Sequence, residues 1–449
     1  MSARLARVRA NPLATAAAVV FVLLKVVYLV RALRPGANEG LHIILGSDSS
    51  TYITTSKLSI FSKGFYEAPG PVGFLVLMKL VARNVRALVI AQTLISIAAW
   101  IGLALSVQSA MRTKAARFVG FAGVLATGLA PAFAMYDIAL ATESLAASLG
   151  CVVLALAIRL AVRADRLTVT AFVVAFAAAA FTHDIDALLA GGVGAVALLA
   201  LLVPRWRAGH WRRLVAVGLV LIAVAGIETE LSNAARRWYW PTAETLTYRV
   251  AGTPDGYKWL VAHGMPDDGS VHLLQSQGYF LAYQGFQADD PPYHALRHWL
   301  DTRGRSTYTR YLLTHPAYVL FEPRHSLAAQ LTPNVAGLAT AQHIEPDPVM
   351  RAIGAVGLPG FRVAIAWAAL ALAAFGWAVF ADPDRRRVGA VLAFMAIVVV
   401  PHAIAVFHGD VFELDRHSLS VALQARVVVW AATAFALDTV LARRVDVVE

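Results

Sequence analysis

Long apolar stretches separated by short polar segments dominate the pattern of hydrophobic and polar positions along this chain. A helix needs about 20 apolar residues to cross the hydrocarbon core of a bilayer. Ten stretches meet or approach that length: Pro12–Leu33, Ala87–Met111, Phe118–Met135, Ala139–Leu160, Thr168–Phe181, Ile185–Val203, Leu214–Leu231, Leu358–Ala381, Val388–Phe407 and Ser418–Leu441. The pattern therefore predicts an all-α polytopic membrane protein with about ten transmembrane helices.

Two longer segments interrupt the apolar pattern. Residues 34–86 separate the first two predicted spans, and residues 232–357 hold most of the polar sequence, with helical patterns between turn signals. We expect 232–357 to form a small, mostly helical cap. It lies between an N-terminal membrane module, 1–231, and a C-terminal one, 358–449. Within the first loop, the apolar run Gly70–Val81 predicts a helix lying in the membrane interface.

Basic residues mark alternate connections, which predicts the orientation of the chain. Cytoplasmic loops of membrane proteins carry an excess of Lys and Arg. Here the basic loops contain Arg112, Lys114, Arg117, Arg163, Arg166, Arg205, Arg207, Arg212, Arg213, Arg385, Arg386, Arg387, Arg443 and Arg444. Both termini are then expected in the cytoplasm, and segments 34–86 and 232–357 outside. The six basic residues of the first outer loop oppose this rule, but the remaining loops outnumber them.

Composition supports a membrane protein. The 449 residues are 58% hydrophobic and 15% charged, whereas soluble domains carry about 25% charged residues. The formal charge is +11, but most arginines cluster in short loops, so we interpret it as a topology signal rather than a nucleic-acid surface. The single cysteine, Cys151, lies in an apolar run and is expected to serve packing.

Acidic residues near the ends of the apolar stretches are the main candidates for function. A carboxylate in hydrocarbon costs about 2.5–3.5 kcal/mol on insertion scales, so such residues usually lie at an interface or in a wet cavity. If the spans alternate in direction, Asp48, Glu143, Asp184 and Asp410 all fall on the extracytoplasmic side. We therefore predict a polar pocket on that face.

Two of these acids stand beside hydroxyl side chains. Asp48 lies within Gly46–Tyr52 and suits a general base acting on a hydroxyl, or a metal ligand. The alternative is a helix cap, a role that Asp and Ser favour. Glu143, between Thr142 and Ser144, suits pairing with a cation, ligand orientation or metal binding, or else simply reaches the headgroup layer.

The turn between the fifth and sixth spans carries His183 and Asp184. This pair suits a metal or a phosphate-linked sugar, although an outer turn must be polar in any case. Leading into the last span, Asp410, Glu413 and His417 share one face if the segment is helical, because they are spaced i, i+3 and i+7.

Several basic residues suit phosphate binding. Arg416 and His417 are expected at the outer membrane surface, where arginine makes bidentate phosphate contacts. Lys79 and Arg83 follow the interfacial run and suit the same role, or simple attraction to anionic lipids.

The chain lacks a P-loop, a glycine-rich dinucleotide turn and a nucleophile elbow. This disfavours an ATP-driven pump or an enzyme with a nucleotide-sugar domain. Because an extracytoplasmic enzyme does not rely on nucleotide-activated donors, a lipid-linked donor is the natural substitute.

Taken in order along the chain, these motifs resemble the GT-C superfamily of integral-membrane glycosyltransferases. Asp48 has the place of the acidic residue in the first outer loop of that family, and Pro69–Phe74 resembles its proline-containing segment before the second span. Leu140–Leu145, which contains Glu143, resembles a Ser/Thr-Glu signature of bacterial members. Gly409–His417 and Trp259–Pro266 resemble actinobacterial members of unassigned substrate.

The resemblance implies an inverting transfer from a polyprenyl-phosphate sugar to an envelope glycan or glycolipid, in the plasma membrane of a bacterium. Asp48 would be the base, and Arg416 and His417 would stabilise the leaving phosphate, with Lys79 and Arg83 in reserve. Substrate would be bound by Glu143, His183, Asp184, Asp410 and Glu413. No cofactor is certain, and a divalent cation stays open because Asp48 stands alone where family members often carry two adjacent acids. The expected partners are the lipid-linked donor, the acceptor and membrane lipids, and no nucleic acid.

Two other functions remain open from the sequence. A transporter or flippase would use the acidic residues as coupling-ion sites. Transporters usually show inverted repeats and spans broken near the midplane, whereas here we see polar residues at one face and no such symmetry. A non-catalytic assembly partner would use them only to solvate its loops.

Overall fold

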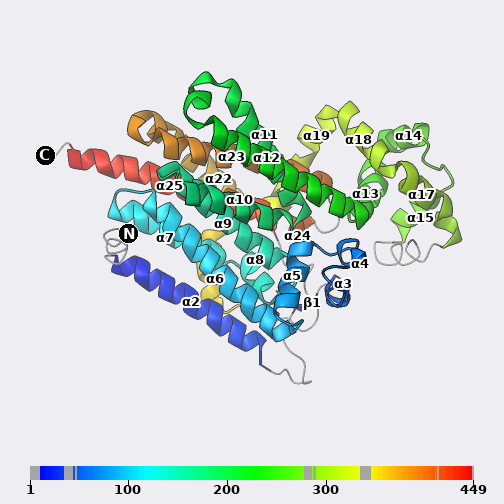
Figure 1. The fold of residues 1–449 in the computed structure, drawn as a ribbon, viewed down its shortest axis with the longest axis horizontal. Coiled ribbons are helices and arrows are strands. Elements are labelled where there is room, and N and C mark those ends of the chain that lie inside the picture. Colours follow the sequence, from blue (N-terminus) through cyan, green and yellow to red (C-terminus); the bar gives the residue numbers. More distant parts are fainter. Residues whose placement is uncertain are drawn as a thin grey trace.

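The computed structural model describes residues 11–34, 44–45, 48–277, 286, 290–333, 345–409, 411 and 414–446. Its long helices lie side by side in an elongated bundle, and short helices gather at one end (Figure 1). The long helices are α2 (Pro12–Ala32), α6 (Val85–Ser109), α7 (Lys114–Gly128), α9 (Glu143–Val162), α10 (Arg166–Ala180), α11 (Asp184–Leu199), α12 (Pro204–Ala234), α22 (Phe361–Ala381), α23 (Arg386–Gly409) and α25 (Leu419–Asp446).

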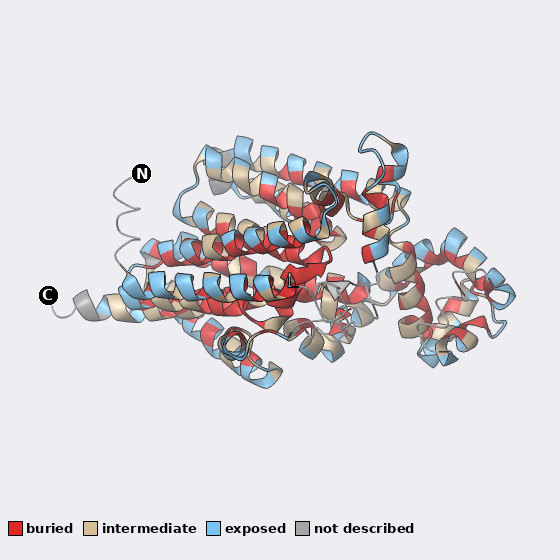
Figure 2. Ribbon diagram, turned by 90° about the horizontal axis from the view of Figure 1, so that it is seen from below, coloured by how far each residue is buried: buried red, intermediate tan, exposed pale blue. Residues whose placement is uncertain are grey.

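Within the described residues, eight helices are long and apolar enough to span a membrane. Their outward faces carry exposed apolar side chains, such as Leu370 (73% exposed) and Phe380 (86% exposed). Figure 2 shows buried residues along the inward faces of the bundle and exposed ones along its outer faces. Apolar surface of this extent marks contact with lipid or another protein. The expected all-α membrane class is confirmed.

Two predicted spans differ from the structure. The stretch expected at Phe118–Met135 is bent by 59° between α7 and the pair formed by α8 (Pro131–Ala134) and η1 (Met135–Ile138). The break falls at Pro131, which lacks an amide hydrogen and restricts the residue before it. The helix α10 has only 15 residues, so it is an apolar helix below the length of the other spans.

The core of the bundle forms where α2, α6, α7, α9 and α25 meet. Its largest fully buried side chain is Trp100, and Trp430 of α25 lies against Gly123 of α7. A short helix, α21 (Pro348–Gly357), packs its glycine face on α7: a Cβ on Gly357 would lie 2.2 Å from the amide nitrogen of Thr127. Close backbone approach of this kind requires small residues.

A cluster of short helices follows α12. It comprises α13 (Tyr239–Glu244), η3 (Thr245–Val250), α14 (Pro254–Ala262), α15 (Ser270–Ser276), η4 (Pro291–Tyr293), α17 (His294–Trp299), η5 (Leu300–Gly304), α18 (Arg305–Thr314), α19 (Pro316–Phe321), η6 (Glu322–Ser326) and α20 (Leu327–Leu331). A separate apolar core, including Leu246, Leu260 and Leu296, holds the helices from α13 to α18 together. Whether 232–357 acts as a cap stays a prediction.

One end of the bundle holds a buried ion network beside the arginine-rich loops. Figure 1 places the start of α2 and the end of α25 at one end, and the short-helix cluster at the other. At the first end, Arg385 donates to Asp438 (2.6 Å), and the same carboxylate accepts from the backbone amides of Arg112 and Thr113. This network ties the segments just before α7 and just before α23 to α25.

A buried ion pair joins α2 to the bent span. Lys25 Nζ lies 2.5 Å from Asp137 Oδ2, and the two side chains are 1% and 4% exposed. Ser96 of α6 and Ser144 of α9 each donate a hydroxyl to the same carboxylate. The pair and its two hydrogen bonds therefore fix the turn from which α9 begins.

Gly357→Ala is expected to destabilise the protein, because its Cβ would overlap the backbone of α7. Overpacking of this kind costs about 1–3 kcal/mol. The control is Gly376→Ala in α22, where a new Cβ meets nothing within 4 Å. Thermal unfolding in detergent should show a lower midpoint for Gly357→Ala only. Equal midpoints for the two variants would contradict the packing of α21 on α7.

Lys25→Met should strongly destabilise the protein, because it leaves a buried carboxylate without its cation. Breaking a buried pair costs about 3–5 kcal/mol. Adding Asp137→Asn should recover most of the loss, since no uncompensated charge then remains. The measurement is thermal unfolding of both variants and the wild type. A double variant that is less stable than Lys25→Met would argue against the pair.

Candidate functional site

A two-residue parallel strand pair sets the geometry of the site. β1 (Ile44–Leu45) pairs with β2 (Ala139–Leu140), with Leu45 opposite Leu140. Asp48 and Glu143 each follow their strand by three residues, at the start of α3 (Ser49–Thr55) and of α9. The hydroxyl of Ser49 also donates to the carbonyl of Leu140 (3.0 Å). The register therefore brings the two acids to the same end of the bundle.

Asp48 lies at the N-cap position of α3, but its side chain does not cap the helix. Instead its Oδ2 accepts from Arg416 Nη1 at 3.0 Å and from the Tyr52 hydroxyl at 3.3 Å. Its side chain is 41% exposed, so solvent or a ligand can reach it. Burial, then the charges of Asp48 and Glu143, raise the pKa of Tyr52 well above its usual value, which keeps this hydroxyl a donor.

Arg416, in the short helix α24 (Leu414–His417), joins the two acids. While Nη1 faces Asp48, Nε lies 2.9 Å from Oε1 of Glu143. The Glu143 side chain is only 3% exposed, against 15% for Arg416. The buried Glu143 thus holds one edge of the guanidinium, and the exposed Asp48 holds another. This arrangement gives a fixed cation next to an accessible carboxylate.

Two histidines extend the cluster. Nε2 of His183 lies 3.2 Å from Nδ1 of His417, and their rings stack 5.4 Å apart. Nη2 of Arg416 lies 3.3 Å from Nε2 of His417. Burial is the main cause that lowers the pKa of His183 well below 6.5, followed by repulsion from His417, His402 and Arg416. His183 is therefore neutral at pH 7.

A second ion network lies next to this turn. Arg237, beyond the end of α12, pairs with Asp184 (3.3 Å) and with the buried Glu228. Ser232 donates its hydroxyl to Asp184 at 3.0 Å, and Arg237 donates to the carbonyl of Gly70 at 3.3 Å. Arg237 and Ser232 therefore both contact Oδ2 of Asp184, while the Asp184 side chain stays 41% exposed.

The helix α5 (Val72–Leu80) packs its start against the same turn. The amide of Gly73 donates to the carbonyl of Phe181 at 2.7 Å, and a Cβ at Gly73 would lie 2.5 Å from the Thr182 hydroxyl. A helix is present where the sequence predicted one, and its glycine permits close contact with the segment before His183. Its place in the membrane interface stays a prediction.

The structure gathers five of the predicted site residues and leaves others apart. Asp48, Glu143, His183, Arg416 and His417 form one chain of contacts, and Asp184 follows His183 directly.

The two reserve phosphate ligands lie away from this chain of contacts. Lys79 donates to the carbonyl of Leu58 and lies over the ring of Phe65, and Arg83 is exposed in a turn with φ +61°. Among the described residues, neither contacts the Arg416 cluster. Asp410 and Glu413 lie outside the described residues.

Sequence reasoning missed four residues that organise the site: Lys25, Asp137, Glu228 and Arg237. Lys25 gave a readable signal, since a lone lysine in the middle of an apolar span needs a buried partner. Asp137 lay in a turn where any polar residue was expected.

A divalent cation does not fit the described cluster as it stands. Within the described residues, no group of three or more His, Cys, Asp and Glu side chains has the arrangement of a metal site. The cation that faces both Asp48 and Glu143 is Arg416. A metal between these carboxylates would have to displace it.

No family model and no curated protein matches this chain. Solved structures that overlap with it include the three that follow. The oligosaccharyltransferase AglB from Archaeoglobus fulgidus, in complex with an inhibitory peptide and a dolichol-phosphate, has 12% identity and a TM-score of 0.48. This overlap covers 97% of the present chain and 52% of AglB, so the chain spans about half the length of that protein.

The other two structures are of ArnT from Cupriavidus metallidurans, each 15% identical to this chain. The apo state has a TM-score of 0.34 and covers 95% of this chain and 78% of ArnT. The state bound to undecaprenyl phosphate has a TM-score of 0.32, and the overlap covers 94% of this chain and 77% of ArnT. With TM-scores below 0.5, these overlaps do not decide the family or the activity of the chain.

Proposed function

We propose that this protein is an integral-membrane glycosyltransferase of the GT-C type. It transfers a sugar from a polyprenyl-phosphate donor to a glycan or glycolipid on the extracytoplasmic side. The supporting observation is the contact between Asp48 and Arg416: an accessible carboxylate and a fixed guanidinium lie 3.0 Å apart at the end of a membrane bundle. Transfer from a lipid phosphate needs a base for the acceptor and a cation for the leaving phosphate.

In this mechanism Asp48 accepts the proton of an acceptor hydroxyl as that oxygen attacks the anomeric carbon. The bond between the anomeric carbon and the phosphate oxygen breaks, and its electron pair leaves with the polyprenyl phosphate. Attack from the face opposite the leaving group inverts the anomeric configuration. Arg416 offers its guanidinium to the phosphate, on which negative charge grows in the transition state.

Glu143 positions Arg416 for this task. Because Glu143 is almost fully buried, its contact with Nε survives when a phosphate competes for the outer edge of the guanidinium. The contact with the half-exposed Asp48 is the one that a phosphate replaces, and this releases Asp48 to act as a base. His417 and Asp184 then lie beside the substrate, with the buried His183 behind His417.

The charge pattern supports the proposed sidedness. The arginine-rich loops lie at the end of the bundle that holds the start of α2 and the end of α25, and the Asp48 cluster lies with the short helices at the other end (Figure 1). Under the positive-inside rule, the termini then face the cytoplasm and the site faces outward from the plasma membrane.

The transporter alternative finds less support in these contacts. A coupling-ion site needs carboxylates that take up a cation and release it. Here Glu143 is buried against Arg416, and Asp184 is paired with Arg237. Ion-dependent uptake into proteoliposomes, without sugar transfer, would favour the transporter.

Asp48→Asn should lower the rate of sugar transfer by about 10²–10⁴-fold, the typical contribution of a general base. The assay is transfer from a labelled polyprenyl-phosphate sugar to an acceptor in proteoliposomes. The control is Asp165→Asn, since Asp165 caps α10 in an exposed loop and asparagine caps equally well. Wild-type activity in Asp48→Asn would remove Asp48 as the base.

Arg416→Gln should abolish transfer and also destabilise the protein, because Glu143 is left buried without a cation, at a cost of about 3–5 kcal/mol. Adding Glu143→Gln should restore stability but not activity, since the leaving phosphate still lacks its cation. Thermal unfolding and the transfer assay separate the two effects. Recovery of activity in the double variant would contradict the role of Arg416.

A further inference from the structure

An open groove with a mixed lining lies in the short-helix cluster, outside the Asp48 site. Its volume is about 540 Å³. One wall is Trp238, just before α13. The opposite wall is formed by successive turns of η5 and α18, which contribute Asp301, Thr302, Arg305, Ser306 and Thr309.

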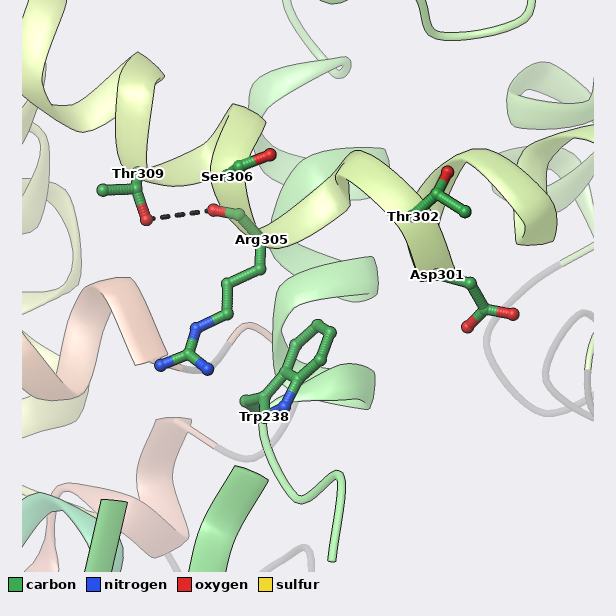
Figure 3. Close-up of a pocket in the computed structure, with 6 residues that line it drawn as sticks. All are labelled: Trp238, Asp301, Thr302, Arg305, Ser306 and Thr309. Carbon is green, nitrogen blue, oxygen red and sulfur yellow. Dashed lines mark hydrogen bonds between the residues drawn. The ribbon is translucent and has the colours of Figure 1, made fainter. Parts of the chain in front are cut away.

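The charged and aromatic side chains of the groove face a common space. In Figure 3 the guanidinium of Arg305 and the carboxylate of Asp301 extend from the helix toward the side on which the Trp238 indole lies. The guanidinium carbon of Arg305 lies 5.5 Å from the centre of the Trp238 ring. Arg305 also donates to Asn233, and Arg236 pairs with Asp301. These contacts orient both charged groups.

The hydroxyls along the helix supply further acceptors. Thr302 donates to the carbonyl of His298 (2.7 Å), Ser306 to that of Arg303 (2.9 Å), and Thr309 to that of Arg305 (2.9 Å). Each hydroxyl proton is therefore committed to the backbone, while the oxygen can still accept a hydrogen bond.

We propose that this groove binds carbohydrate and holds the acceptor glycan. A sugar ring offers one flat C–H face, which suits an indole, and a rim of hydroxyls that both donate and accept. Arg305 supplies donors, and Asp301 with the helix hydroxyls supplies acceptors. A phosphate would be repelled by Asp301, and an apolar peptide would cover both charged groups without bonding to their remaining donors and acceptors.

The groove connects to the candidate site through the chain itself. Trp238 follows Arg237, whose guanidinium pairs with Asp184 and Glu228 and reaches the carbonyl of Gly70. A glycan stacked on Trp238 would thus contact the residue that directly follows Arg237 in the chain. That the bound glycan is the acceptor rests on the proposed function. That the groove binds sugar does not.

The test is saturation-transfer NMR of the full chain in detergent, with two neutral probes, mannotetraose and arabinotetraose. We expect at least one probe to bind the wild type, and Trp238→Ala to weaken it on the order of tenfold by removing the stacking surface. Because Trp238 also packs on Tyr239, its loss could disturb the local fold. Arg305→Gln is therefore a second variant, at an exposed position, and it should also weaken sugar binding.

The matched control is Trp377→Ala. Trp377 is 49% exposed on α22, and Arg443 lies 5.4 Å from the centre of its ring, so it repeats the Trp–Arg pair away from the groove. Its loss should leave sugar binding unchanged. The proposal would be overturned if neither probe bound the wild type. It would also be overturned if the wild type, Trp238→Ala and Arg305→Gln bound the probes equally.

A sugar-transfer assay separates this inference from the proposed function. If both hold, Trp238→Ala raises the KM for acceptor and leaves the KM for donor unchanged. Probe binding that depends on Trp238, without transfer by the wild type, rejects the transferase and keeps the glycan site. Transfer whose acceptor KM is the same in Trp238→Ala rejects the groove alone. Groove-dependent binding of phosphatidylglycerol vesicles, with no sugar binding, would assign it to lipid headgroups.

Discussion

The guanidinium of Arg416 is the contact on which the site depends. It joins Glu143, which is buried and needs a cation, to Asp48, which is exposed and can meet a substrate. A buried carboxylate at the end of a membrane helix is costly unless it is paired. The ion pair thus satisfies the buried carboxylate and also places a cation beside an accessible one.

Other parts of the bundle fix this contact. The β1–β2 pair sets Asp48 and Glu143 in register, and the Lys25–Asp137 pair holds the turn before α9. Ser144 links the Lys25–Asp137 pair to the Arg416 site, because its hydroxyl donates to Asp137 and it directly follows Glu143. The bend at Pro131 also contributes, because an unbroken helix would carry the turn that contains Asp137 away from Lys25.

Much of the fold was predictable from hydropathy, because a membrane helix must be apolar along its length. The bend at Pro131 was readable from the proline, and the shortness of α10 from its 14-residue apolar stretch. The two-residue strands could not be predicted from the sequence, because their pairing joins segments that are distant in sequence. The separation of the short helices by their own core follows from the aromatic and leucine content of 232–331.

Some members of the candidate site were predictable from the sequence, but their contacts were not. Sequence position placed Asp48, Glu143 and Arg416 near the same face, but it could not show that one guanidinium joins the two acids. Spacing also suggested Lys79, whose amine instead meets the carbonyl of Leu58, since α5 packs along its own loop. Arg237 and Glu228 escaped notice because their pairing depends on how α12 ends.

The most direct test of the proposed mechanism is a density map of the protein in a lipid nanodisc with a bound polyprenyl phosphate. The proposed mechanism predicts a phosphate oxygen at hydrogen-bond distance, about 3 Å, from the guanidinium of Arg416, with Glu143 still on its other edge. A lipid phosphate bound elsewhere in the bundle, with the Asp48–Arg416 contact intact, would contradict it.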